Sequence, residues 1–256
     1  MCLIIFAYRT HPDYLLVLAA NRDEFYDRPA LGARFWEDCP GLLAGKDLKG
    51  GGTWMGVHES GRYAALTNYR AIETRLPDAP SRGLLVRQYL EQGKSAESFP
   101  RMLKNSEDYN GFNFLAGDRD SLYHFSNQSN RLTRIQPGIH GISNALMDTP
   151  WPKVHHSKKQ MKSLIETDSV TEESLFGMLL NRETYPGDSL PETGLPPELE
   201  KAVSPVFIQT PDYGTRCSTL LFISHDGEVR FTERVYRPGT GIVAEENRYS
   251  FEFDSL

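Results

Sequence analysis

The sequence has few cysteines, no long apolar run and no excess of basic residues, and each shortage excludes a class of protein. Three cysteines in 256 residues do not make the disulfide framework of a small secreted domain. No apolar stretch approaches the roughly 20 residues that span a bilayer. No basic segment precedes the first apolar run, whereas a signal peptide has one at that place. We therefore expect no integral membrane segment and a reducing, cytoplasmic location.

Acidic residues outnumber basic ones, which argues against nucleic acid as a partner. The formal net charge is −6 and the sequence pI is about 5.7. Binding to phosphate backbones needs clustered Lys and Arg in excess. Hydrophobic residues make up 39% and charged residues 24%, a globular composition. The length fits one large domain or two small ones.

Signals for nucleotide and metal sites are weak. The glycine-rich stretch 44–52 resembles a phosphate-binding loop only loosely, since Asp47 stands where Ser or Thr belongs and its carboxylate would repel phosphate. A tight turn is the favoured interpretation. His155 and His156 are adjacent, so on a helix they diverge by about 100° and do not share a metal easily. No cofactor and no metal site are expected.

The hydrophobic pattern predicts strands, then helices, strands, helices and strands again. This order favours an α+β fold of antiparallel hairpins with helices on the sheet faces, because the regular alternation of a doubly wound parallel fold is missing. The proline-rich segment 183–205 fits either a surface loop or a lid over a site. The expected strands are 2–8, 14–20, 53–58, 62–68, 111–117, 122–125, 138–144, 205–208, 214–223, 229–234 and 249–253. The expected helices begin near Ser81, Ser95, Pro150 and Ser169, and the last has a capping box to Glu172. The first helix has an apolar face of Leu85, Val86, Tyr89 and Leu90 and is ended by Gly93. The second has an apolar face of Phe99, Met102 and Leu103.

The first hairpin brings polar residues back to the start of the chain. Its two apolar runs flank a turn near His11, so residue i is expected to face residue 22 − i. Cys2 then faces Ala20. The following residues, 21–23, are Asn-Arg-Asp and lie beside Cys2.

Cys2 has the chemistry of a nucleophile if Met1 is removed. It then carries both a thiol, with a pKa near 8.5, and an α-amine, with a pKa near 8. One residue thus supplies a nucleophile and its base. Cations such as Arg22 or Arg216 would favour the thiolate, and Asp23 could hold the ammonium.

Other residues of this region leave a simpler alternative open. Asn68 and Asn144 follow strands and could donate to the oxyanion of a tetrahedral intermediate. Equally, Cys2 could be an apolar residue that begins an edge strand, with Asn-Arg-Asp a turn that holds a surface ion pair. Cys39 precedes Pro40, a pair that binds haem iron in some proteins and is a plain loop in most. Cys217 is expected in the core.

Several motifs together resemble the NRDE family, also called the transport-and-Golgi-organisation family, over essentially the whole chain. The motifs are Met1-Cys2-Leu3-Ile4, Asn21-Arg22-Asp23-Glu24-Phe25 with Arg28-Pro29, Gly45-Lys46-Asp47, Gly51-Gly52-Thr53-Trp54-Met55-Gly56, Leu66-Thr67-Asn68-Tyr69-Arg70, Gly141-Ile142-Ser143-Asn144 and Arg216-Cys217-Ser218-Thr219. That family in turn resembles the bile-salt-hydrolase and penicillin-acylase branch of N-terminal-nucleophile hydrolases. The resemblance implies one domain over residues 1–256, folded as a four-layer αββα sandwich of two antiparallel sheets.

The resemblance also implies roles for five residues. Cys2 would be the nucleophile and Asp23 its contact. Asn68 and Asn144 would bind the oxyanion and orient the substrate, and Arg216 would be the late arginine of the active centre.

One position departs from the branch. Ala20 stands where an arginine usually precedes the aspartate, and the nearest arginine is Arg22. Because strand neighbours point to opposite faces, Asp23 is expected to enter the site and Arg22 to hold the turn.

The leading hypothesis is therefore a cysteine hydrolase, amidohydrolase- or acyltransferase-like, that cleaves a small amide through a Cys2 thioester. The alternative is a non-catalytic protein that handles haem or a lipid on the same fold. The oligomeric state stays open.

Overall fold

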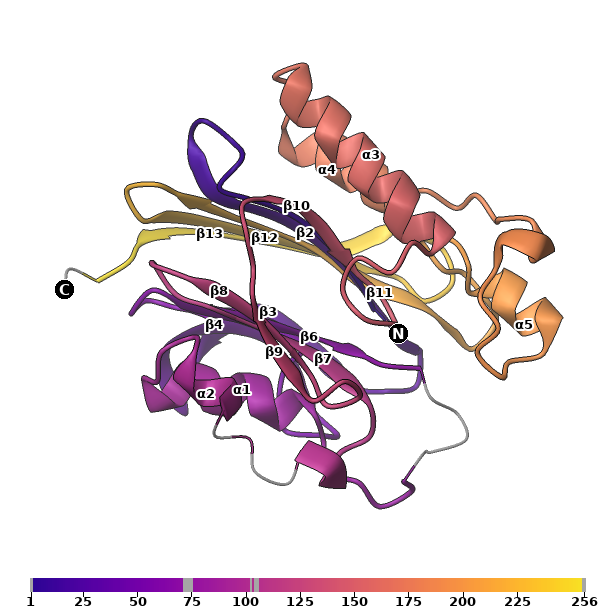
Figure 1. Ribbon diagram of the computed structural model, residues 1–256, viewed down its shortest axis with the longest axis horizontal. Helices are drawn as coiled ribbons and strands as arrows, with labels where there is room; N and C mark the ends of the chain where they lie inside the picture. Colours follow the sequence, from indigo (N-terminus) through magenta and orange to yellow (C-terminus); the bar gives the residue numbers. More distant parts are fainter. Residues whose placement is uncertain (1, 71–75, 102, 104–105, 255–256) are drawn as a thin grey trace.

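The computed structural model describes residues 2–70, 76–101, 103 and 106–254, and it shows two antiparallel sheets stacked face to face (Figure 1). α3 (Pro152–Glu166) and α4 (Glu172–Leu179) cover the outer face of the first sheet, and α1 (Gly83–Gln92) and α2 (Ser98–Arg101) cover that of the second. This is the expected four-layer αββα sandwich. Met102, expected on the second helix, lies outside the described residues.

The first sheet has six strands in the order β10-β1-β2-β11-β12-β13, and the second has seven in the order β3 to β9. The strands of the first sheet are β1 (Cys2–Tyr8), β2 (Tyr14–Phe25), β10 (Gly138–Ile142), β11 (Tyr213–Ser224), β12 (Glu228–Tyr236) and β13 (Val243–Glu252). Those of the second are β3 (Ala30–Trp36), β4 (Cys39–Asp47), β5 (Met55–His58), β6 (Arg62–Asn68), β7 (Phe112–Gly117), β8 (Leu122–Ser126) and β9 (Arg131–Arg134). The remaining elements are α5 (Pro197–Ala202), η1 (Ser106–Asp108) and η2 (Gly187–Ser189).

Strand alternation builds the layers. On β1, Ile4 and Phe6 point into the core between the sheets, whereas Leu3 and Ile5 point toward α3 and α4. Both faces of β1 and β2 are therefore buried, and this explains their nearly continuous apolar sequences. Two independent cores hold the middle of the first sheet and fix the end of β1, where Cys2 lies.

The first hairpin forms as expected, but its register differs by two residues. Residue i faces 24 − i, so Cys2 faces Arg22 and Ala20 faces Ile4. The turn is centred on Pro12 because the backbone N–H of Arg9 bonds to the carbonyl of Leu15 and closes a longer loop. The expected pairing of Cys2 with Ala20 is therefore wrong.

Several other expectations need correction. β3, β4 and β9 had no prediction, and residues 205–208 form no strand, only a bridge from Gln209 to Gly214 nearby. Ser81 does not cap α1, whose N-cap is Arg82 without a side-chain bond. Its apolar face is buried as expected, and Gly93 ends the helix in the left-handed conformation that glycine adopts freely.

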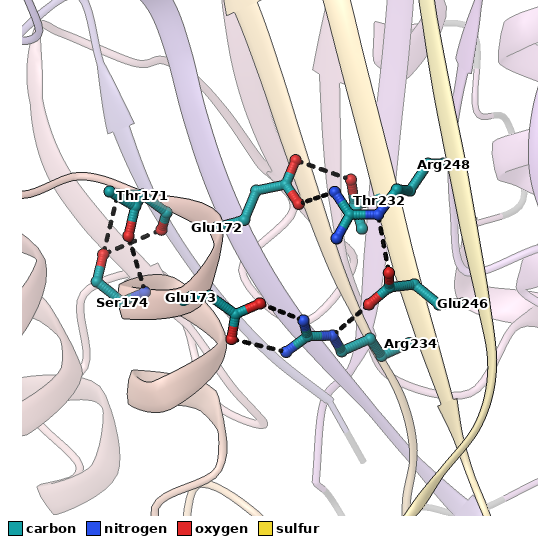
Figure 2. A network of polar contacts seen from close by, with 8 residues as sticks. All are labelled: Thr171, Glu172, Glu173, Ser174, Thr232, Arg234, Glu246 and Arg248. Atoms are coloured by element: carbon teal, nitrogen blue, oxygen red, sulfur yellow. Dashed lines mark hydrogen bonds and ion pairs between the residues drawn. The ribbon is translucent and has the colours of Figure 1, made fainter.

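The capping box of α4 lies two residues after the expected one. The backbone N–H of Ser174 donates to Thr171 Oγ1 (3.1 Å), and the backbone N–H of Thr171 donates to Ser174 Oγ (3.0 Å). Ser169 and Glu172 do not form the box, because Glu172 turns toward the sheet (Figure 2).

Charged residues tie the start of α4 to β12 and β13 (Figure 2). Arg248 joins Glu172 (2.6 Å) and Glu246 (2.8 Å), and Arg234 joins Glu246 (2.6 Å) and Glu173. Single exposed ion pairs contribute at most about 1 kcal/mol, but a shared network orients its members. The network thus sets where α4 lies on the sheet.

Among the described residues, none of the helices is both long and apolar enough to traverse a lipid bilayer.

Candidate active site

Cys2 lies between a polar residue of β2 and one that follows the end of β10. On one side it faces Arg22 of β2. On the other, the register of β1 with β10, continued by two residues, places Asn144 opposite it. Ser143 Oγ donates to the backbone carbonyl of Cys2 at 3.1 Å and holds this side in place. The order across the sheet is therefore Asn144, Cys2, Arg22.

The side chain of Arg22 enters the site, contrary to expectation. Facing residues of an antiparallel pair project to the same side, so Arg22 shares the inter-sheet face of Cys2. Its guanidinium lies 4.4 Å from the Trp54 ring centroid and 3.6 Å from Asp47 Oδ2. A cavity at this face is lined by Cys2, Ile4, Ala20, Asn21, Arg22, Trp54, Met55, Leu66 and Thr219.

Asp23 reaches Cys2 through its backbone. Its backbone N–H lowers the pKa of the Cys2 thiol, while its carboxylate accepts the hydroxyl of Thr215 (2.7 Å) on the helix side of the sheet. Burial raises the pKa of Asp23, and the nearby Lys153 ammonium opposes this rise. The carboxylate thus lies on the face opposite Arg22.

Asn144 joins the two sheets beside Cys2. Its Nδ2 donates to the backbone carbonyl of Asn68 at the end of β6 (2.8 Å), and the backbone N–H of Arg70 donates to the carbonyl of Asn144 (2.8 Å). Asn113 anchors the next residue, donating to the carbonyl of Ala145 (2.8 Å). An amide nitrogen carries two hydrogens, so the Asn144 side chain can make a second donation.

Arg216 holds a turn. It is the extra residue of a bulge in β11, between Thr215 and Cys217. Its Nη1 donates to the carbonyls of Phe25 (2.7 Å) and Arg28 (2.9 Å), just after β2. Arg216 therefore fills the turn-holding role that the sequence had suggested for Arg22.

Lys153 is the residue near Cys2 that sequence reasoning missed. It is 3% exposed, and its Nζ donates to the carbonyl of Val203 (3.3 Å). Burial lowers its pKa to about 8, and the charge of Asp23 raises it in part; Cys2 acts on it as well. In the sequence it follows Pro152 like any lysine in a first helical turn, so the pattern gave no sign of burial.

The other cysteines lie in cores. Cys39 begins β4 and packs with the apolar face of α1, so the expectation of a loop cysteine is wrong. This burial does not favour Cys39 as a haem ligand. Cys217 is buried in β11 as expected, directly opposite Arg22.

The arrangement offers a thiol and a cation at one cavity, with the Asn144 amide just past the end of β10 beside Cys2. Burial raises the pKa of the Cys2 thiol, the charge of Asp23 raises it further, and Arg22 lowers it. A thiolate is the reactive form of cysteine, and Arg22 favours that form of Cys2. The Asn144 amide can donate to an oxygen that becomes negative beside the thiol.

Replacement of Arg22 by methionine is therefore expected to slow alkylation of Cys2 by iodoacetamide several-fold at pH 7. Loss of the cation raises the pKa of the thiol and leaves less thiolate. Peptide mass spectrometry measures the rate at Cys2 alone. Arg34→Met, at an exposed position, is the matched control. An unchanged or faster rate in the Arg22 variant would contradict this role.

Comparison with known proteins gives a family and a likeness of fold to solved structures. Residues 1–238 match the family model described as Transport and Golgi organisation 2. A Transport and Golgi organization protein 2 homolog from Bos taurus is 36% identical over 91% of this chain and 92% of its own length. A Mus musculus homolog is 32% identical over 100% of both chains. A cysteine-to-alanine mutant of conjugated bile acid hydrolase from Clostridium perfringens has a TM-score of 0.57 at 10% identity, covering 97% of this chain and 92% of that one. The last likeness concerns the fold.

Proposed function

We propose, from the premise that this chain belongs to the Transport and Golgi organisation 2 family, that it is a cysteine hydrolase of a small amide with Cys2 as its nucleophile. The observation that carries the proposal is the position of Cys2 between Arg22 and Asn144 at an inter-sheet cavity. The solved structure of like fold is named a hydrolase of a conjugated bile acid, which agrees with this class of reaction.

The reaction has two halves. The Cys2 sulfur attacks the amide carbonyl carbon, a C–S bond forms, and the oxygen becomes negative where Asn144 donates. The α-amine, free once Met1 is removed, takes the thiol proton and passes it to the departing nitrogen as the C–N bond breaks. Water then adds to the thioester, releases the carboxylic acid and restores the thiol.

The surrounding residues have supporting roles. Arg22 stabilises the thiolate that forms when the α-amine takes the proton, and the backbone N–H of Asp23 orients it. The Asp23 carboxylate stabilises the α-ammonium by its charge. Asn68 positions Asn144 through its carbonyl, and Arg216 keeps the end of β2 in place. We infer one domain for the chain, and the low cysteine number supports a cytoplasmic location for the reaction.

Intact-mass spectrometry tests the proposal. The purified native protein is expected to lack Met1, and incubation with a reactive β-lactam or activated amide probe is expected to add one acyl group. Digestion should locate that group on Cys2. If the Met-free protein forms no adduct with a broad set of such probes, the proposal is wrong.

A further inference from the structure

β13 lies at the edge of the first sheet and leaves one side of its backbone unpaired. In the sheet order it is a neighbour of β12 alone. The backbone N–H of Phe253 donates to the carbonyl of Gly227, so these two residues form a hydrogen-bonded pair, and such pairs alternate along an antiparallel ladder. No strand of the described residues pairs with the other side of β13. The backbone groups that point to that open side are those of Glu246, Arg248, Ser250 and Glu252.

The open edge ends just after the strand. The backbone N–H of Asp254 donates to the carbonyl of Glu59 (2.8 Å), and Arg119 donates to the carbonyl of Asp254. Glu59 and Arg119 lie in the β5–β6 and β7–β8 turns, so the second sheet covers the chain at this end. An unpaired strand edge is a template for another strand. The stretch 243–252 can therefore accept one, and Asn247 lies near its middle.

The charges of β13 are complementary to a second copy of the same strand. Glu246 and Arg248 are exposed and lie two residues apart, so they share one face of the strand (Figure 2). When two copies pair antiparallel about a two-fold axis at Asn247, Glu246 faces the partner's Arg248 and Arg248 faces the partner's Glu246. Opposite charges at facing positions stabilise an antiparallel pair, and the two-fold axis makes the contact twice.

The neighbouring registers that keep the outward backbone groups opposite each other are less favourable. An axis at Glu246 or at Arg248 places that residue opposite its own copy, and like charges at facing positions are destabilising. An axis at Tyr249 places Glu246 opposite Glu252. An axis at Ser250 pairs Arg248 with Glu252, but it moves the partner strand toward the end that the second sheet covers. The charges and the open length together therefore favour the axis at Asn247.

Exposed apolar side chains near both ends of β13 fit the same axis. Ile242 and Val243, at its start, are 55% and 43% exposed. Near its other end, Phe35 of β3 is 37% exposed, and its ring centroid lies 5.6 Å from that of Tyr249 and 5.8 Å from that of Phe251. The axis brings the start of one strand beside the end of the other. Pairing thus removes apolar surface from water at both ends, which is favourable.

We propose that this chain forms a homodimer in which two copies of β13 pair antiparallel about Asn247 and join their six-stranded sheets into one. The inference is independent of the proposed function, since β2, β11 and β12 separate β13 from the strand that carries Cys2. The competing role of the charges is to keep the edge unpaired and the chain monomeric, as charged residues on edge strands do in other proteins.

Light scattering after size-exclusion chromatography measures the mass over a series of concentrations. At the higher concentrations we expect twice the chain mass of 29.0 kDa. Arg248→Glu sets carboxylates opposite each other and is expected to weaken the dimer about tenfold or more. Adding Glu246→Arg exchanges the two charges and should restore the dimer. Arg131→Glu, the same change at an exposed position of the edge strand β9, should leave the dimer intact, and circular dichroism checks that each variant is folded.

Cysteine cross-linking tests the position of the axis. Facing residues of a non-hydrogen-bonded pair have Cα atoms about 4.5 Å apart, which is within the range of a disulfide. Under oxidation, Asn247→Cys should therefore form a covalent dimer that a reductant separates. Ser250→Cys and the parent protein should form none.

A parent protein that is monomeric at every concentration would overturn the proposal and assign the charges of β13 to protection of the edge. The same holds for a dimer that Arg248→Glu leaves intact, that the exchanged pair does not restore, or that Arg131→Glu weakens as strongly. A covalent dimer from Ser250→Cys in place of Asn247→Cys would overturn the register. Because none of these measurements uses Cys2 chemistry, failure of the hydrolase proposal leaves them unaffected.

Discussion

Replacement of Cys2 by alanine is expected to reduce amide hydrolysis and acyl-probe labelling to background. The substitution removes the sulfur that forms the thioester, and no other described residue supplies a nucleophile at the same place between Arg22 and Asn144. Loss of a catalytic nucleophile typically costs several powers of ten in rate. Amine release from a panel of acyl amides, read by fluorescamine, measures the loss. The fold should survive, because the side chain of alanine is smaller than that of cysteine and fits the same space.

Two matched variants make this result specific. Cys39→Ala removes a thiol in the core under α1 and should keep full activity per folded molecule. Cys2→Ser keeps an oxygen nucleophile and should retain a small residual rate. Cys217 is a poor control, since it faces Arg22 and its loss would disturb the site. Activity retained by Cys2→Ala would place the nucleophile elsewhere.

Much of this site was accessible from the sequence because it depends on hairpin register. Two apolar runs with a short turn fixed the pairing of β1 and β2 to within two residues. The predicted register was wrong by two residues, and a shift of two residues leaves every side chain on the same face of the sheet. Alternation along the two predicted strands already placed Arg22 on the same face of the sheet as Cys2. The preference for Asp23 over Arg22 came from matching a motif by residue type.

Other features depend on contacts that no local pattern carries. The bulge at Arg216 arises from the pairing of β11 with β2, which lie far apart in sequence. β4 escaped prediction because Gly41 and Lys46 interrupt its apolar residues, and β3 because Gly32 and Arg34 interrupt its own. Lys153 is buried by α5 and the segment before it. The sequence pattern of a helix does not reveal burial by a segment that lies far away in the chain.

Asn21 shows how a residue of the recognised motif can serve the fold. Its side chain lies on the helix side of β2, opposite the face that carries the Arg22 side chain. Its Nδ2 donates to the carbonyls of Leu179 and Val206, both at 2.9 Å, and its Oδ1 accepts the hydroxyl of Ser218 at 2.5 Å. One buried amide thus ties the end of α4 and the segment before β11 to the sheet.

Asn21→Leu is therefore expected to lower the free energy of unfolding by about 3 kcal/mol or more, since each buried polar group left without a partner costs about 1–3 kcal/mol. Leucine is close to asparagine in size, so the loss comes from the bonds. Urea denaturation measures it. Ser218→Ala removes one of the bonds and should cost about 1 kcal/mol, less than the total.

The double variant decides whether Asn21 acts through these bonds. If Asn21→Leu has already lost the contact with Ser218, adding Ser218→Ala should cost less than it does alone, a coupling of about 0.5–3 kcal/mol for residues in one network. The hydroxyl of Tyr236 also donates to Ser218 Oγ (2.9 Å), so part of the cost should remain. Strictly additive effects, or a loss below about 1 kcal/mol for Asn21→Leu, would contradict this structural role.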